Sequence, residues 1–279
     1  MDLAVDTEPH KWFTLNLENI LIKREGATEI LMMNVPIEKI VKERLFTHVF
    51  QPIHIVHTGE ITGYESLIRC EYFSSPTALF QEADKKGLLF ELDCASMLEA
   101  MRVYKFHYRN ELIYPRLSVN ILPSTLLNPS FKSFLEEAIV DVQFPMNRMV
   151  FEINEAEAIP HLETLNDSIH DLKSIGALVA LDDLGKGQSS IRSVIELEPN
   201  IIKLDRYFGK DLSKHARKQH FLKSLVYFLA RDHIVLEGIE SEEDLECARK
   251  IGVHFGQGYY LGKPHSVEKC ESFPLNFLP

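Results

Sequence analysis

Short apolar runs that each end in a polar residue recur along this 279-residue chain, and helical patterns lie between most of them. Alternating strands and helices are typical of β/α units that build a parallel sheet. In a (β/α) barrel, catalytic and metal-binding side chains stand at the carboxyl ends of successive strands. Six runs have this form, and the polar residues that follow them are Asn120, Glu152, Asp182 with Asp183, Lys203, Glu237 and Gln257. This set predicts an enzyme built on a (β/α) barrel.

The length and composition fit one barrel domain with a substantial core. Apolar residues make up 45% of the chain, and no long low-complexity stretch indicates disorder. No run of about 18 apolar residues is present, so we expect no membrane insertion. The first six residues are acidic and lack the basic and apolar regions of a secretory signal. We therefore expect a cytoplasmic protein.

The cysteines and the net charge narrow the class of partner. Cys70, Cys94, Cys247 and Cys270 are scattered and form no C-x-x-C pair, which favours four reduced thiols over a zinc site or disulfides. The formal net charge is −11, and this opposes binding of a nucleic acid polymer, which needs a basic face. A small phosphate ligand remains compatible with an acidic site when divalent cations lie between the two.

The chain divides into an extension and a barrel. We expect residues 1–45 to be a partly helical N-terminal extension, docked on the domain or belonging to a sensory partner, and residues 46–279 to form the barrel. Apolar runs at 48–56 and 61–68, joined by Thr58-Gly59-Glu60, predict a hairpin. Helices are predicted over 75–86, 89–108, 129–140, 160–174, 189–197, 213–232 and 242–251, with a weaker helical pattern at 37–45.

Oxygen donors dominate the candidate site, and they are Glu65, Asn120, Glu152, Asp182 and Asp183. Oxygen ligands suit Mg²⁺, Mn²⁺ or Ca²⁺ rather than zinc. Asp182 is the natural bridge of a two-metal site, because Asp183 beside it can serve the second ion. Lys203, one unit later, can orient an attacking water or stabilise a phosphoryl oxygen. Two alternatives stay open, namely a solvated Asp-Asp loop and a structural salt bridge at Lys203.

Eight short motifs, in order and with compatible spacing, resemble the EAL domain family over about residues 46–270. They are Gln51-Pro52-Ile53, Gly63-Tyr64-Glu65-Ser66-Leu67-Ile68-Arg69, Ser118-Val119-Asn120, Phe151-Glu152-Ile153-Asn154-Glu155, Leu181-Asp182-Asp183-Leu184-Gly185-Lys186-Gly187, Ile202-Lys203-Leu204-Asp205, Glu237-Gly238-Ile239-Glu240 and Gln257-Gly258-Tyr259-Tyr260. The resemblance implies an α/β fold, a modified (β/α)8 TIM-like barrel with one reversed strand. It also implies a bacterial phosphodiesterase that hydrolyses cyclic di-GMP to linear pGpG with two Mg²⁺ or Mn²⁺ ions, and Ca²⁺ is expected to inhibit.

The resemblance also implies roles for single residues. The first metal would be held by Glu65, Asn120, Glu152 and Asp182, and the second by Asp182 and Asp183 with support from Glu237. Lys203 would activate or position the nucleophilic water, and Gln257 would hydrogen-bond at the reaction centre. Substrate contacts are implied for Gln51, Leu67, Arg69, Asp205 and Glu240, with Arg69 on phosphate, Leu67 under a base, and Asp205 and Glu240 beside the guanine pocket. Glu155 would anchor the loop after Asp182-Asp183.

Departures from the family pattern lie at Ser66, where the family usually has Ala, and in the loop at Leu184, Lys186 and Gln188. The family couples this loop to dimerisation, so a homodimer is expected, and the loop departures bear on its rate and coupling. They keep one alternative open, a weakly active or inactive receptor that binds cyclic di-GMP without turning it over.

Overall fold

A long antiparallel hairpin begins the barrel and contains its one reversed strand. In the computed structural model, β1 (Thr47–Ile55) pairs with β2 (Ile61–Arg69), and Thr47 lies opposite Arg69. β1 also pairs antiparallel with β8 (Phe255–Gly256), whereas β2 to β8 are parallel neighbours in chain order. The eight strands close into a barrel, which confirms the predicted fold class and hairpin. The structure describes residues 35–111, 114–186, 191–229 and 234–271.

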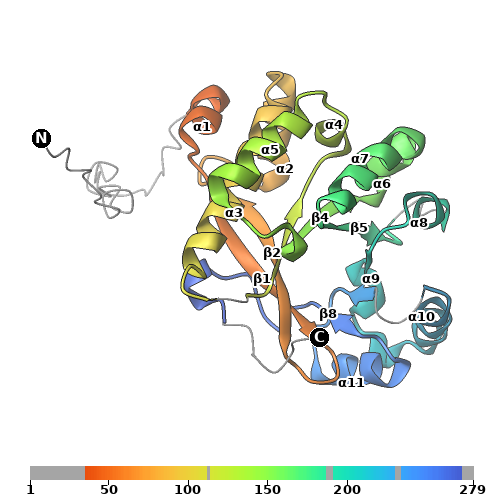
Figure 1. Cartoon of the computed structure of the whole chain (residues 1–279). Helices are drawn as coiled ribbons and strands as arrows, with labels where there is room; N and C mark the ends of the chain where they lie inside the picture. Colours follow the sequence, from red (N-terminus) through yellow and green to blue (C-terminus); the bar gives the residue numbers. More distant parts are fainter. Residues whose placement is uncertain (1–34, 112–113, 187–190, 230–233, 272–279) are drawn as a thin grey trace, which may run out of the picture. The chain divides into compact units, whose positions relative to one another are not determined.

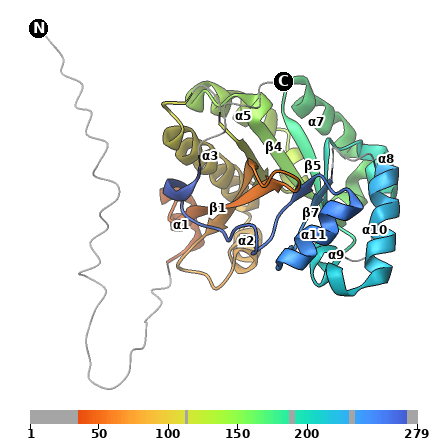
Figure 2. The same cartoon turned by 90° about the horizontal axis from the view of Figure 1, so that it is seen from below.

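Helices surround the strands, as Figure 1 and Figure 2 show from two directions. The other strands are β3 (Arg116–Asn120), β4 (Met149–Asn154), β5 (Leu178–Leu184), β6 (Ile201–Leu204) and β7 (Ile234–Leu236). The longer helices are α1 (Ile37–Glu43), α2 (Pro76–Lys85), α3 (Leu89–His107), α5 (Phe131–Val142), α7 (Leu162–Ser174), α8 (Ile191–Leu197), α10 (Ala216–Leu229) and α11 (Glu242–Ile251). These elements match the predicted helices to within a few residues at the described ends.

Local sequence signals explain where several helices begin and end. The hydroxyl of Ser75 accepts a hydrogen bond from Ala78 N (3.1 Å), and Pro76 occupies the first turn of α2. Ser241 caps α11 in the same way through Asp244 N (3.2 Å). Gly252 ends α11 in a left-handed conformation with φ 94°, which glycine adopts without steric cost.

Three four-residue helices stand directly after strands and were not predicted. They are α4 (Pro123–Leu126), α6 (Glu155–Ala158) and α9 (Arg206–Gly209). One turn is too short to show helical periodicity in a sequence. Their importance lies in their place, because α4, α6 and α9 follow β3, β4 and β6 at the carboxyl ends of these strands.

Two hydrophobic clusters support the fold. The main core fills the space between the strands and most of the surrounding helices. A separate cluster, called here the second core, comprises Ile37, Ile40, Phe46, Ile68, Leu79, Ala83 and Leu92. It joins α1, α2 and α3 to the end of β2. Among the described residues, no helix is long and apolar enough to cross a membrane.

The predicted N-terminal extension is described only in part. Residues 35–46 contain α1 and lead into β1, while residues 1–34 lie outside the described residues. The same holds for the ends of two predicted helices, at 189–190 and 230–232. The assignment of residues 1–45 as an extension therefore stays a prediction.

Candidate functional site

One buried lysine lies at the centre of four carboxylates. Lys203 Nζ is 3.1 Å from Glu65 Oε2, 2.7 Å from Glu152 Oε2, 3.2 Å from Asp182 Oδ1 and 2.9 Å from Glu237 Oε1. The side chain of Lys203 is only 1% exposed. Burying an ammonium is costly without partners, and these four carboxylates supply them. The salt-bridge alternative thus describes real contacts of Lys203, and it does not exclude a chemical role.

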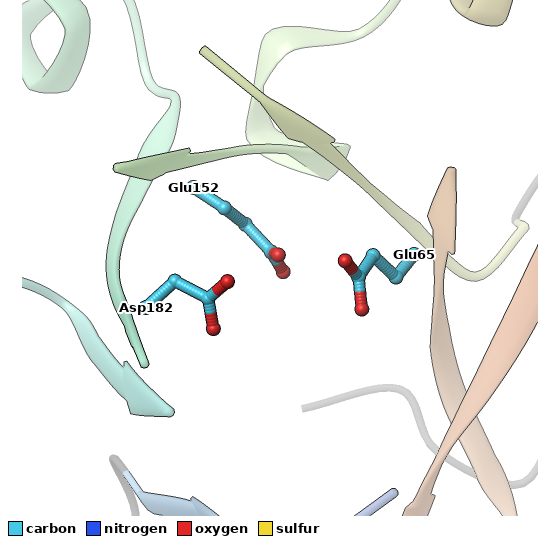
Figure 3. Close-up of side chains that lie close together, drawn as sticks. All are labelled: Glu65, Glu152 and Asp182. Carbon is cyan, nitrogen blue, oxygen red and sulfur yellow. The ribbon is translucent and has the colours of Figure 1, made fainter. Parts of the chain in front are cut away.

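The barrel brings these residues together from separate strands. Glu65 stands on β2, Glu152 on β4, Asp182 on β5 and Lys203 on β6, while Glu237 directly follows β7. Side chains of a barrel strand alternate between its inside and outside, so matching positions on neighbouring strands share one face. Figure 3 shows the carboxylates of Glu65, Glu152 and Asp182 pointing toward one another from their three strands.

A bulge in β5 allows adjacent aspartates to serve one site. On a regular strand Asp182 and Asp183 would point to opposite faces. The register with β6 shifts between Leu181 and Leu184, and Asp183 has φ 60°. This irregularity turns both carboxylates toward the cluster, and such bulges are common beside active sites. The side chains of Asp182 and Asp183 are 13% and 19% exposed, so neither carboxylate is fully solvated.

The carboxylates form two overlapping groups that fit divalent cations. Ligand atoms of Glu65, Glu152 and Asp182 lie within 4.8 Å of one another, and so do those of Asp182, Asp183 and Glu237. Asp182 belongs to both groups, as a bridging ligand would. The all-oxygen donor set is that of hard cations. Lys203 balances only one of the negative charges, so the residues present fit metal ions.

The side-chain amides of Asn120 and Gln257 also contact Glu65. Asn120 Nδ2 donates to Glu65 Oε1 (3.2 Å), and Gln257 Nε2 donates to Glu65 Oε2 (2.8 Å). The buried carbonyl oxygen of Gln257 has no hydrogen-bond partner among the described residues. A buried amide oxygen without a partner is uncommon and marks a place for a ligand or an ordered water. Both residues thus reach the cluster that the sequence assigned to them.

The pKa values follow from burial and mutual charge. Burial opposes the charge of Lys203, but the four carboxylates outweigh it and raise the pKa of Lys203 well above its usual range. Burial raises the pKa of Glu152 well above its usual value and that of Glu237 to about 7, although Lys203 opposes both shifts. Burial acts the same way on Glu65, but Lys203, Gln257 and Asn120 together lower its pKa. Protons held at this cluster would be displaced by a divalent cation.

Two contacts of Asp183 were not predicted from the sequence. Asp183 Oδ2 accepts hydrogen bonds from Lys186 Nζ (2.7 Å) and from Asn154 Nδ2 (3.0 Å). Asn154 also caps α6 by accepting from Ala156 N (3.0 Å). The sequence signal that could have pointed to Asn154 was its place at the end of β4, two residues after Glu152 in the same motif. Lys186 is therefore not a free cation beside the carboxylate cluster, because it is paired with Asp183 Oδ2.

The remaining loop residues have different environments. Leu184 is buried in the main core, so this departure from the family pattern concerns packing. Glu155 Oε1 accepts a hydrogen bond from Ser193 Oγ (3.0 Å), which ties the end of β4 to α8 across the loop. The anchoring role of Glu155 stays a prediction. Gln188 lies outside the described residues.

The predicted substrate residues fall into separate places. Leu67, Arg69 and Asn120 line a cavity of about 140 Å³ between the end of β2 and helices α2 and α3. Ser66 also lines this cavity, and its buried hydroxyl has no hydrogen-bond partner among the described residues. This cavity, called here the β2 cavity, adjoins the carboxylate cluster through Asn120.

The other three predicted substrate residues do not line the β2 cavity. Gln51 Nε2 donates to Gly262 O (3.2 Å). Asp205 is buried and caps α9 by accepting from Tyr207 N (2.8 Å). Glu240, after β7, lies 3.7 Å from the guanidinium of Arg206 and 3.8 Å from Lys210 Nζ. Asp205 and Glu240 thus frame the carboxyl ends of β6 and β7 rather than that of β2.

A closed barrel with one reversed strand and a carboxylate cluster at its strand ends defines a TIM-like barrel with an enzyme-type site. The family model described as the EAL domain matches residues 37–264, and the chain belongs to this family. The matched region includes α1.

Curated relatives carry related names. The chain is 27% identical over 235 residues to the cyclic di-GMP phosphodiesterase PdeA of Borreliella burgdorferi, which covers 82% of this chain and 35% of that protein. It is 28% identical over 241 residues to the cyclic di-GMP phosphodiesterase PA2567 of Pseudomonas aeruginosa, with 83% and 40% covered. The matched region spans only 35% to 40% of these two relatives.

Solved structures share the fold. The Klebsiella pneumoniae BlrP1 complex with manganese and cyclic di-GMP superposes with a TM-score of 0.72 at 22% identity, covering 84% of this chain and 57% of that one. The EAL domain of Xanthomonas citri FimX in complex with cyclic di-GMP gives a TM-score of 0.75 at 19% identity, covering 85% and 94%. These likenesses establish the barrel architecture.

Proposed function

We propose that this chain is a divalent-metal-dependent phosphodiesterase that hydrolyses cyclic di-GMP to linear pGpG. The observation that carries the proposal is the pair of carboxylate groups that share Asp182 beside Lys203. Membership of the EAL family and the names of the two curated relatives support the same substrate.

The residues present would hold two ions. Glu65, Asn120, Glu152 and Asp182 would bind the first, which needs Asn120 to turn its carbonyl oxygen to the ion. Asp182 and Asp183 would bind the second, with Glu237 as a direct or water-mediated ligand. When bound, Mg²⁺ or Mn²⁺ would lower the pKa of a water and neutralise charge on the phosphoryl oxygens. Ca²⁺ should support binding and inhibit turnover.

The side chains of this chain position the reactants. Lys203 would hydrogen-bond the attacking water and stay charged throughout, since its pKa is raised well above the usual range. The unpartnered carbonyl oxygen of Gln257 can accept a hydrogen bond from a water at the same centre. The oxygen of that water forms a bond to one phosphorus, and the bond from phosphorus to the 3′ oxygen of the opposite ribose breaks. One proton of the water ends on the leaving 3′ oxygen, which becomes a hydroxyl. One water is consumed, and linear pGpG is the only product.

The substrate would extend from the cluster in two directions. Arg69 would contact a phosphate and Leu67 would lie under the base that enters the β2 cavity. Gln51, Asp205 and Glu240 would contact the other half of the molecule, with Asp205 and Glu240 beside its guanine. We further propose that the protein is a cytoplasmic homodimer, in keeping with the family's coupling of the loop after Asp183 to dimerisation.

A specific contact supports the alternative of a cyclic di-GMP receptor with weak activity. Lys186 donates to Asp183 Oδ2 at 2.7 Å, so a tethered cation occupies part of the second metal group. If the second ion bound too weakly, the chain would bind its nucleotide without hydrolysing it efficiently.

Product analysis tests the proposed function directly. Incubation of the protein with cyclic di-GMP and Mg²⁺ or Mn²⁺ should yield pGpG, identified by chromatography and mass spectrometry. The same mixture with Ca²⁺ should show nucleotide binding and no product. Binding without product in all three metals would establish the receptor, and the absence of both binding and product would overturn the proposal.

Replacing Lys186 tests the weakened second site. Lys186→Thr should tighten binding of the second Mn²⁺ by about 5-fold, because it removes a partly screened cation from a ligand oxygen. Calorimetric Mn²⁺ titration at low and moderate salt is the measurement, and the gain should shrink at higher salt. Lys214→Thr is the matched control, since Lys214 Nζ pairs with Asp211 three residues earlier at 2.6 Å, away from the cluster. Equal Mn²⁺ binding by both variants would mean that Lys186 does not compete with the second ion.

A further inference from the structure

The second core lies directly behind the residues assigned to the substrate. Ile68 stands between Leu67 and Arg69 near the end of β2 and belongs to this cluster. Adjacent strand residues point to opposite faces, so Ile68 faces α1 and α2 while its two neighbours face the site. Ile68, a member of the second core, and Phe80, which packs against it, also line the β2 cavity. The second core therefore forms part of the wall of the cavity.

Helix α1 contributes the outer side of this cluster. Ile37 and Ile40 are 3% and 0% exposed, and they are packed together with Leu79 of α2 and Leu92 of α3. Deeply buried side chains of this kind transmit displacement, because protein interiors are close-packed and deform little. A shift of α1 must be accommodated by α2, by α3 or by the end of β2.

The backbone links α1 to both sides of Arg69. Helix α1 ends at Glu43, and the next residue, Arg44, is left-handed with φ 53°. The guanidinium of Arg44 lies 3.7 Å from the carboxylate of Glu99 on α3. The chain then enters β1, where Thr47 pairs with Arg69 itself. On the other side of Arg69, the thiol of Cys70 donates to Leu45 O (3.4 Å). The strand end that carries Arg69 is thus held between segments that leave α1.

The carboxylate cluster depends on other contacts. Glu152, Asp182 and Lys203 stand on β4, β5 and β6, whose apolar neighbours belong to the main core. Glu65 shares β2 with Arg69 but is held by hydrogen bonds from Lys203, Gln257 and Asn120. A change at α1 should therefore reach the substrate residues before it reaches the metal ligands.

We propose that α1 sets the affinity for the substrate by positioning Arg69, Leu67 and the wall of the β2 cavity through the second core. Ile40 is the central positioning residue, and it contacts neither the substrate nor the metals. This inference rests on the proposed function, because the ligand concerned is the base and phosphate of cyclic di-GMP. Helix α1 thus has a role in substrate recognition that is separate from the chemical step. A displacement of α1 would change the affinity for cyclic di-GMP.

Truncation of Ile40 tests the inference in the full chain. Ile40→Ala should raise KM for cyclic di-GMP, and its Kd in Ca²⁺, by about 10-fold, while kcat and Mn²⁺ binding change by less than about 2-fold. Ile169→Ala is the matched control, since Ile169 of α7 is equally buried at 2% but belongs to the main core. It should lower Tm without raising KM. Hydrogen exchange at residues 67–70 should increase in Ile40→Ala alone.

The outcomes separate this inference from the proposed function. Ile40→Val is a milder change that should fold even where Ile40→Ala does not, and a smaller rise of KM in it supports the inference. An unchanged KM in a folded Ile40 variant, an equal rise in Ile169→Ala, or a loss confined to kcat would overturn it. If the wild-type protein neither binds nor hydrolyses cyclic di-GMP, the proposed function itself fails.

Discussion

Asp182→Asn should lower the turnover of cyclic di-GMP by about 10³-fold or more. Asp182 is the one residue common to both carboxylate groups, so the substitution removes negative charge from both metal sites. Metal ions supply several kcal/mol of transition-state stabilisation, and each ~1.4 kcal/mol corresponds to a factor of ten in rate. The bulge at Asp183 should persist, because asparagine has nearly the same shape as aspartate.

Mn²⁺ titration and turnover of the same preparations check this prediction. Asp182→Asn should weaken both Mn²⁺ sites, whereas Asp183→Asn should weaken one. Asp244→Asn serves as a control for loss of a buried carboxylate, because Asp244 is 3% exposed and accepts hydrogen bonds from Ser213 N (2.8 Å) and Ser213 Oγ (2.7 Å). Wild-type turnover in Asp182→Asn, or two intact Mn²⁺ sites, would refute the assignment of a bridging ligand.

Much of the site could be predicted from the strand-end pattern, because this pattern is visible within each short segment of the sequence. Glu152, Asp182 and Lys203 each follow an apolar run, and a parallel barrel brings such strand ends to one face. Glu65 did not follow this pattern, because β2 continues for four residues beyond it to Arg69. It entered the analysis as an oxygen donor and through family resemblance. The reversed strand was visible as a hairpin with a short turn.

Features that depend on long-range packing were not predictable in this way. The pairing of Asp183 with Asn154 and Lys186 requires the bulge in β5, which no local pattern indicates. The second core joins residues from Ile37 to Leu92, and no periodicity within one element shows that it lies behind the β2 cavity. Only the folded arrangement connects α1 to Arg69.

Lys203→Met should abolish most turnover while leaving affinity for cyclic di-GMP in Ca²⁺ within a few-fold of wild type. Methionine retains the apolar stem but removes the ammonium that contacts four carboxylates and is assigned to the attacking water. Arg69→Ala is the informative contrast, since loss of a phosphate contact should reduce affinity instead. Equal loss of affinity in the two variants would contradict this division of roles.

In the absence of metal, Lys203→Met should also change the stability of the protein in a way that depends on pH. Removing one partner of a buried ion pair typically costs about 3–5 kcal/mol, which would lower Tm by roughly 10 °C in EDTA. With Lys203 present, burial already raises the pKa of Glu237 to about 7. Loss of the Lys203 ammonium should raise the pKa of the neighbouring carboxyls further. A group whose pKa is raised on folding favours the folded state at low pH, and this contribution is lost as pH rises through the folded pKa.

Lys203→Met in EDTA should therefore be more stable at pH 5 than at pH 8, and Mn²⁺ should restore more stability to it at pH 8 than to wild type. Thermal denaturation at both pH values, with EDTA or Mn²⁺, measures this. Lys186→Met is the control, because the side chain of Lys186 is 65% exposed and the loss of its ammonium leaves the buried carboxylates paired with Lys203. If Lys203→Met were equally stable at both pH values in EDTA, Lys203 would not be what limits proton uptake by the carboxylate cluster before metal binds.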